Sequence, residues 1–164
     1  MYAAGHYGVS LLAYAPVGAT LVGAGRADLA FVGGAVVLWL ATLPDVDHRL
    51  PFVEHRTVTH TIPFALLIGA AVGGVAYVGA AALPDLFGSS ETAGAFGAFL
   101  GTYAIVAHLL GDVVTPSGIP LLWPLTGRSY TLSLWTAKNR VANYGLLALG
   151  VFVTAVTAYG LGLA

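Results

Sequence analysis

The chain has 164 residues, of which 58% are hydrophobic and 8% are charged. Soluble domains carry about 25% charged residues, so this composition excludes an ordinary soluble domain and indicates an integral membrane protein. The absence of cysteine excludes disulfides and thiolate metal ligands, and a net charge of -1 gives no indication of nucleic-acid binding. We expect no signal peptide, because the first residues lack a basic region.

Apolar runs predict about five membrane-spanning helices, since about 20 residues are needed to cross the hydrocarbon core. We expect these spans at residues 7–24, 28–44, 61–83, 94–115 and 141–163. Within them, the small-xxx-small spacings Gly69/Gly73 and Gly97/Gly101 favour close approach of helix backbones. The predicted fold is therefore a single-domain, all-α integral membrane bundle over residues 1–164.

The longest connection, residues 116–140, contains too many Pro and Gly residues to span a membrane, yet it is too apolar for a free aqueous loop. Trp123, Tyr130 and Trp135 suit the level of the lipid headgroups, where amphipathic rings gather. We expect a segment that lies in the membrane interface. A short re-entrant hairpin that covers a site is the alternative.

The distribution of basic residues predicts the orientation of the bundle. An odd number of passes places the N-terminus, residues 45–60 and residues 116–140 on one face. The opposite face has only Arg26, whereas the first face carries Arg49, Arg56, Arg128, Lys138 and Arg140. The positive-inside rule therefore places the first face in the cytoplasm and the C-terminus outside, in the cytoplasmic (inner) membrane.

A group of His and Asp residues falls at the predicted cytoplasmic ends of the spans. Such side chains are costly near hydrocarbon and are typical of functional sites there. Their convergence from several helices predicts a metal site, with these candidate ligands: His6, Asp45, Asp47, His48, His60, His108 and Asp112.

Two local patterns carry this prediction. His108 and Asp112 are four residues apart, hence on the same helical face, where they could hold a cation or simply hydrogen-bond to each other. Asp45, Asp47 and His48 offer two carboxylates and an imidazole on a tight loop, for which helix capping or solvation is the alternative.

A third pattern surrounds the start of the third span. Thr59 could cap that helix, which would place His60 in its first turn. Arg56 has a fork geometry that suits a phosphate or carboxylate, although positive-inside bias explains it equally well. His55 could be a ligand, a proton donor or a headgroup contact.

A site of imidazoles and carboxylates suits zinc, with manganese or iron as harder alternatives. The candidate ligands exceed the needs of one tetrahedral zinc, so we expect two divalent metals bridged by a carboxylate. Such pairs activate water and stabilise displacement at phosphorus, whereas structural zinc is often cysteine-rich. A catalytic or transport role is therefore favoured.

Four segments in chain order resemble a known family: Gly5-His6, LPDVDH at 43–48, HRTVTHT at 55–61 and HLLGDVVTPSGIPLLWP at 108–124. They resemble the LexA-binding, inner-membrane-associated, metal-dependent hydrolases of bacteria and archaea. The resemblance implies a metal-dependent hydrolase at the inner membrane. No residue outside these motifs supports a LexA-type regulatory partner.

The same residues have a more distant similarity to zinc-dependent phospholipase C and related zinc nucleases. By that similarity, one metal would be held by Asp45 or Asp47, His60, His108 and Asp112. A second metal would share Asp112 and add His6. Those enzymes hold a third metal with a later His-x-x-x-Glu pair, but this chain has no His after His108 and no Glu after Glu91. His48 and His55 could partly replace what is missing.

We therefore expect a membrane-bound phosphoesterase that acts on phospholipid headgroups at the cytoplasmic face, through a metal-activated hydroxide. A free Asp of the Asp45/Asp47 pair, or His55, would handle the proton, and Arg56 would steady the phosphate. The alternatives are a metal-ion or proton transporter and a non-catalytic scaffold whose metal joins the helices. A transport path is disfavoured because the ionisable residues lie at one face and leave the other half of the bundle apolar.

Overall fold

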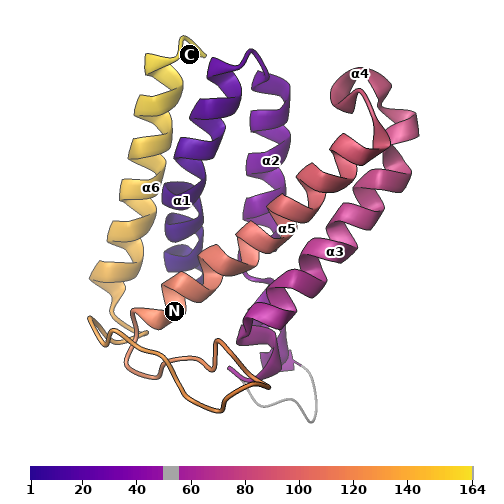
Figure 1. The fold of residues 1–164 in the computed structure, drawn as a ribbon. Coiled ribbons are helices and arrows are strands. Elements are labelled where there is room, and N and C mark those ends of the chain that lie inside the picture. The colour runs from indigo at the N-terminus through magenta and orange to yellow at the C-terminus, as the bar shows by residue number, and fades with distance from the viewer. Residues whose placement is uncertain (50–55, 164) are drawn as a thin grey trace.

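The computed structural model describes residues 1–49 and 56–163, and the regular elements within them are helical (Figure 1). The α-helices are α1 (Ala3–Gly23), α2 (Ala27–Leu40), α3 (Ile62–Gly79), α4 (Pro84–Phe87), α5 (Ser90–Val113) and α6 (Arg140–Gly160). Three 3-10 helices lie between them: η1 (Leu43–Arg49), η2 (Val58–His60) and η3 (Ala80–Ala82). The prediction of an all-α membrane bundle is confirmed.

Within residues 1–49 and 56–163, four helical segments are long and apolar enough to cross a membrane: Ala27–His48, Ile62–Ala82, Ser90–Val113 and Arg140–Gly160. The first predicted span is also a helix, α1, but it is not among these four. Its polar residues His6, Ser10 and Tyr14 lower its hydropathy, and all three are buried. The polarity of α1 therefore reflects contacts inside the bundle.

The helix boundaries differ from the predicted spans where local interactions set them. Helix α5 begins at Ser90 rather than residue 94, because the Ser89 hydroxyl accepts a hydrogen bond from the Thr92 amide at 3.2 Å. Helix α2 ends at Leu40, ahead of Pro44, and the chain continues as η1. Pro44 has no N–H to donate to the Leu40 carbonyl and its ring crowds that carbonyl, which accounts for this early end.

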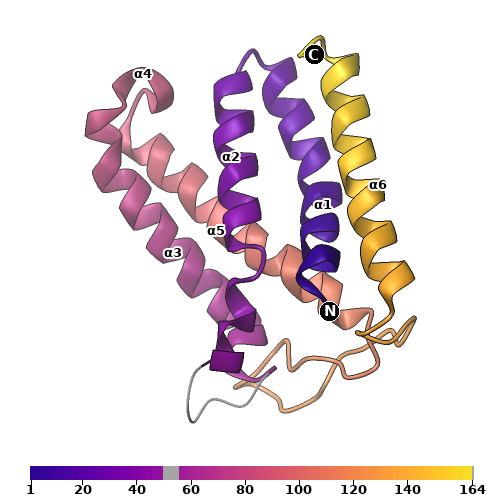
Figure 2. The ribbon, with the colours of Figure 1, turned by 180° about the vertical axis from the view of Figure 1, so that it is seen from behind.

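The long helices form two groups that meet along α5. Helices α6, α1 and α2 stand side by side. Helix α5 crosses the bundle obliquely, and α3 runs alongside it (Figures 1 and 2). The predicted close approach occurs between α3 and α5: a Cβ added to Gly101 would lie 3.0 Å from the Gly69 Cα atom. Glycine at these positions lets the two backbones touch.

The segment between α5 and α6 covers the end of the bundle where the N-terminus lies (Figure 1). It is attached to the end of α5 by hydrogen bonds from the Leu132 amide to the Val113 carbonyl at 2.7 Å and from the Leu134 amide to the Val114 carbonyl at 2.8 Å. Leu125 is 88% exposed, and Leu132 and Leu134 are exposed as well. Exposed apolar side chains support the predicted interfacial location, because the interface accommodates them.

Candidate metal site

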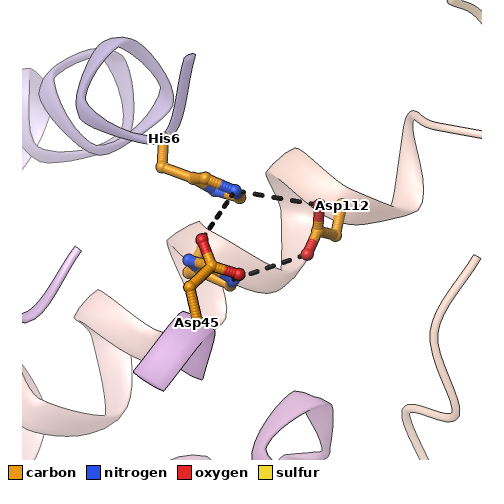
Figure 3. Close-up of side chains that lie close together, drawn as sticks. His6, Asp45 and Asp112 are labelled. Carbon is orange, nitrogen blue, oxygen red and sulfur yellow. Dashed lines mark ion pairs between the residues drawn. The ribbon is translucent and has the colours of Figure 1, made fainter. Parts of the chain in front are cut away.

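Polar residues from four elements meet at this end of the bundle. His6 comes from the first turns of α1, Asp45 from η1, His60 from η2, and His108 and Asp112 from the last turns of α5. Figure 3 shows His6, Asp45 and Asp112 pointing toward one another. His6, His60, His108 and Asp112 are fully buried, whereas the Asp45 side chain is 21% exposed. Segments far apart in sequence thus build one cluster.

Two of the imidazoles are oriented so that the same ring nitrogen faces the centre of the cluster. His108 Nδ1 lies 2.8 Å from the Ala41 carbonyl oxygen, so this nitrogen donates the hydrogen bond and leaves the Nε2 lone pair free. His60 Nδ1 faces Asp47 Oδ2 at 3.3 Å, and its Nε2 also points inward. Metal-binding histidines typically have this outer contact to a carbonyl or carboxylate.

Three inward-facing ligand atoms lie at nearly the spacing that a tetrahedral zinc requires, and one oxygen of Asp45 lies slightly farther from two of them. His60 Nε2 and His108 Nε2 are 3.3 Å apart, and Asp112 Oδ2 lies 3.2 and 3.4 Å from them. Asp45 Oδ1 lies 3.6 and 3.7 Å from the same two nitrogens. Ligands about 2.0–2.1 Å from a tetrahedral zinc are about 3.3–3.4 Å apart.

The donor chemistry of this cluster also fits a cation. Within the part of the chain that the structure describes, Asp112 Oδ2 is buried without a hydrogen-bond donor, although two imidazole nitrogens face it. Burying a carboxylate oxygen among lone pairs is costly unless a proton or cation joins them. The residues present therefore fit a divalent metal held by two imidazoles and two carboxylates.

The second oxygens of the same two carboxylates point toward His6. His6 Nε2 lies 3.7 Å from both Asp45 Oδ2 and Asp112 Oδ1, and its ring stacks on His108 with centroids 3.8 Å apart. Asp112 Oδ1 also contacts the Met1 amino group at 2.8 Å and Arg56 Nη2 at 2.9 Å. Each carboxylate thus faces two cationic positions, one between His60 and His108 and one beside His6. The Met1 amino group and Arg56 already approach the second position.

Asp47 lies behind His60 rather than among the inward-facing ligand atoms. Its Oδ2 atom accepts hydrogen bonds from the Thr59 hydroxyl at 2.8 Å and the Arg56 amide at 3.1 Å. Arg56 has a positive φ of 64°, a conformation that costs a non-glycine residue of order 1–3 kcal/mol. The Asp47 carboxylate therefore holds both the His60 ring and the Arg56 backbone in position.

The prediction that Thr59 caps the third helix is wrong. The N-cap of α3 is Thr61, whose hydroxyl accepts a hydrogen bond from the Phe64 amide at 3.2 Å. Pro63 occupies the first turn, where its missing N–H leaves no helical hydrogen bond unmade. The Thr59 hydroxyl instead donates a hydrogen bond to Asp47, and His60 lies in η2 just before α3.

The remaining predicted residues lie at the edge of the cluster. His48 is exposed, although Asp45, Asp47 and His48 could each place one ligand atom within 4.8 Å of the others. His55 lies outside the described residues. Sequence reasoning missed three contributors: the Met1 amino group, the Ala41 carbonyl and the Thr115 hydroxyl, which accepts a hydrogen bond from Arg56 Nη1 at 3.2 Å. A backbone carbonyl leaves no sequence signal.

His60, which precedes the α3 span, shows the electrostatic character of the cluster. Burial alone would lower the pKa of its imidazole, but the carboxylates of Asp112 and Asp45 outweigh burial and raise the pKa above its usual value. Without a metal, the cluster thus favours a proton on His60. A divalent cation would compete with that proton for the same ring nitrogen.

Comparison with known protein families identifies the family of this chain. The family described as YdjM inner membrane protein matches residues 1–164, the whole chain. The chain belongs to the YdjM inner membrane protein family. No curated protein and no solved structure matches it. Membership in the YdjM family, together with the four apolar spans, makes it an integral protein of the inner membrane.

Proposed function

We propose that this inner-membrane protein is a metal-dependent hydrolase of phosphoesters, with phospholipid headgroups as its substrates. The observation that carries the proposal is the closely spaced, inward-facing set of donor atoms from Asp45, His60, His108 and Asp112. The resemblance of the motifs around these residues to inner-membrane metal-dependent hydrolases, and more distantly to zinc-dependent phospholipase C, supports it. The site would face the cytoplasm, as the basic residues predict.

Bound divalent metal would supply a Lewis acid and lower the pKa of water at the site. We assign the first metal to these four residues and a second metal to His6 together with the other oxygens of Asp45 and Asp112. Zinc suits the imidazole-rich set best, with manganese or iron as alternatives.

The chain's own residues would orient the substrate and move the proton. Arg56, which is 12% exposed and contacts Asp112 and Thr115, would bind a phosphate oxygen beside the cluster. Because Asp45 is assigned to the metals, Asp47 is the member of the Asp45/Asp47 pair that would accept a proton, beside the hydrogen bonds it receives from the Arg56 amide and the Thr59 hydroxyl. His55 remains the predicted alternative for the proton.

The test is the metal content and hydrolytic activity of detergent-purified protein. Elemental mass spectrometry should find zinc or manganese in the wild type, and bis(4-nitrophenyl) phosphate should be hydrolysed. His108→Ala should lose both metal and hydrolysis, because it removes one of the inward-facing nitrogens. Leu110 lies on the same helix and is 54% exposed, so Leu110→Ala is the control and should keep both metal and hydrolysis.

Other outcomes of this experiment distinguish the alternatives. Bound metal without hydrolysis of any phosphoester would contradict the hydrolase and leave a transporter or a metal-joined scaffold. Uptake of zinc into protein-containing vesicles would then identify the transporter. Absence of bound metal after reconstitution with zinc and manganese would contradict the hydrolase, the metal-ion transporter and the metal-joined scaffold, and would leave the proton transporter.

A further inference from the structure

A cavity of about 510 Å³ lies beside the candidate metal site, between the start of α1, the end of α2 and η1. Its wall includes Ala3, Trp39, Leu43, Asp45 and Val46. Asp45 belongs to both places, because its carboxylate also faces His60 and His108. The cavity therefore borders the cluster at Asp45.

The mouth of this cavity lies on the flank of the bundle. Trp39 belongs to the membrane-spanning segment Ala27–His48 and is 79% exposed, so its ring faces lipid. Val46, one residue after Asp45, is 38% exposed. Tryptophan near the end of a span favours the depth of the lipid headgroups. The cavity thus opens toward the bilayer at headgroup depth.

The end of the bundle is more closed than its flank in the described part of the chain. His6, His60, His108 and Asp112 are fully buried, and the segment after α5 is hydrogen-bonded across the end through Leu121, whose carbonyl accepts from the Ile62 amide at 2.9 Å. Asp45 is the cluster carboxylate with partial exposure, and it also lines the cavity.

We infer that this cavity admits a phospholipid laterally from the bilayer, with the phosphate at Asp45 and the acyl chains remaining against Trp39 and Val46. The inference rests on the proposed function, since a phosphate beside Asp45 requires bound cation to balance the carboxylate charge. An apolar mouth at headgroup depth matches an amphiphile, whose tail stays in lipid while its phosphate reaches a polar site. Ala3, Trp39 and Val46 are then specificity-determining residues.

The inference can be tested by photo-cross-linking in nanodiscs of phosphatidylethanolamine and phosphatidylglycerol. The probe is phosphatidylethanolamine with a diazirine on the acyl chain next to the headgroup, and cross-linked peptides are identified by mass spectrometry. We expect cross-links to concentrate on the peptides containing Ala3, Trp39 and Val46. Val141, 84% exposed on α6, reports the level due to surrounding bulk lipid.

A matched pair of variants decides whether the cavity is responsible. Ala3→Trp fills the mouth and should abolish the concentrated cross-links, whereas Ala71→Trp, at an exposed alanine of α3, should preserve them. Metal content of Ala3→Trp, measured by elemental mass spectrometry, should equal that of the wild type and so show that the site is intact.

The inference and the proposed function fail separately. Cross-links at the mouth no stronger than at Val141, or unchanged by Ala3→Trp, overturn lateral access even where bis(4-nitrophenyl) phosphate is hydrolysed. Concentrated cross-links that Ala3→Trp removes would support lateral access of the lipid. If the same protein hydrolyses neither bis(4-nitrophenyl) phosphate nor phosphatidylethanolamine, the hydrolase is overturned.

Discussion

The two halves of α5 contact the rest of the bundle in different ways. In the first half, Gly97 and Gly101 pack against the backbone of α3, and a Cβ on Gly97 would lie 2.9 Å from the Val72 carbonyl oxygen. In the second half, His108 and Asp112 are fully buried but face charged and polar partners from three other elements. One half is held by close apolar packing and the other by a polar cluster.

This difference shows where stability and binding capacity lie in the protein. Close packing of small residues stabilises helix pairs in lipid through van der Waals contacts. Buried carboxylates and imidazoles are weak contributors to stability, and they persist where a site requires them. Substitutions in the two halves should therefore separate folding from metal binding.

The largest effect is expected at the polar end. Asp112→Asn keeps the shape of the side chain but removes the charge that both cationic positions share, so metal affinity should fall by more than about 100-fold, beyond the loss typical of outer contacts. Competition with a chelating dye measures it. The exposed Asp28, which pairs with Arg26 at 2.9 Å, is the control, and Asp28→Asn should bind metal normally. Unchanged affinity in Asp112→Asn would remove this residue from the site.

The packed half of α5 is tested by two neighbouring glycines of its partner helix α3. A Cβ on Gly73 would lie 2.8 Å from the Gly94 carbonyl oxygen, whereas a Cβ on Gly74 meets no atom within 4 Å. Gly73→Ala should therefore destabilise the protein by about 1–3 kcal/mol. Gly74→Ala should be neutral or slightly stabilising, because alanine is the better helix former.

Thermal unfolding in detergent, followed by circular dichroism, measures this difference. Equal midpoints for Gly73→Ala and Gly74→Ala would show that α3 and α5 do not approach as closely as the structure has them. Metal content of both variants should match the wild type at temperatures below unfolding.

A smaller effect on metal affinity is expected at Thr59, which lies behind the His60 ring. Thr59→Val removes the hydroxyl that donates to Asp47 and lies 3.0 Å from His60 Nδ1, so both the imidazole and the carboxylate behind it lose a partner. Loss of such an outer contact should lower metal affinity by about tenfold. Thr20→Val is the control, since the exposed Thr20 hydroxyl bonds only to the Pro16 carbonyl of its own helix at 2.8 Å. If both variants bind metal equally, Thr59 does not position the site.

The smallest effect is expected at the far end of α5. Ser89→Ala removes the side-chain cap of this helix, which should cost about 1 kcal/mol of stability. Metal affinity should not change, because the cap lies at the end of α5 opposite to Asp112. A drop in metal affinity, measured with the same dye, would show that the two halves of α5 are coupled.

The sequence by itself determined the membrane class, the positions of the long helices and the depth at which the His and Asp residues gather. These features follow from composition and from apolar runs, which act locally along the chain. The glycine spacing also predicted that helix backbones approach closely at these residues, because spacing along a helix fixes which residues share a face, whereas the pairing of α3 with α5 came from the structure.

Only the tertiary structure decided how the polar residues divide their roles. The DVDH motif at 45–48 offers two equivalent carboxylates, yet Asp45 faces the cluster while Asp47 turns to Thr59 and the Arg56 backbone. Likewise, the Ala41 carbonyl fixes the His108 ring, and Thr61 rather than Thr59 caps α3. Such choices depend on atoms brought together from distant segments, and a local pattern carries no information about them.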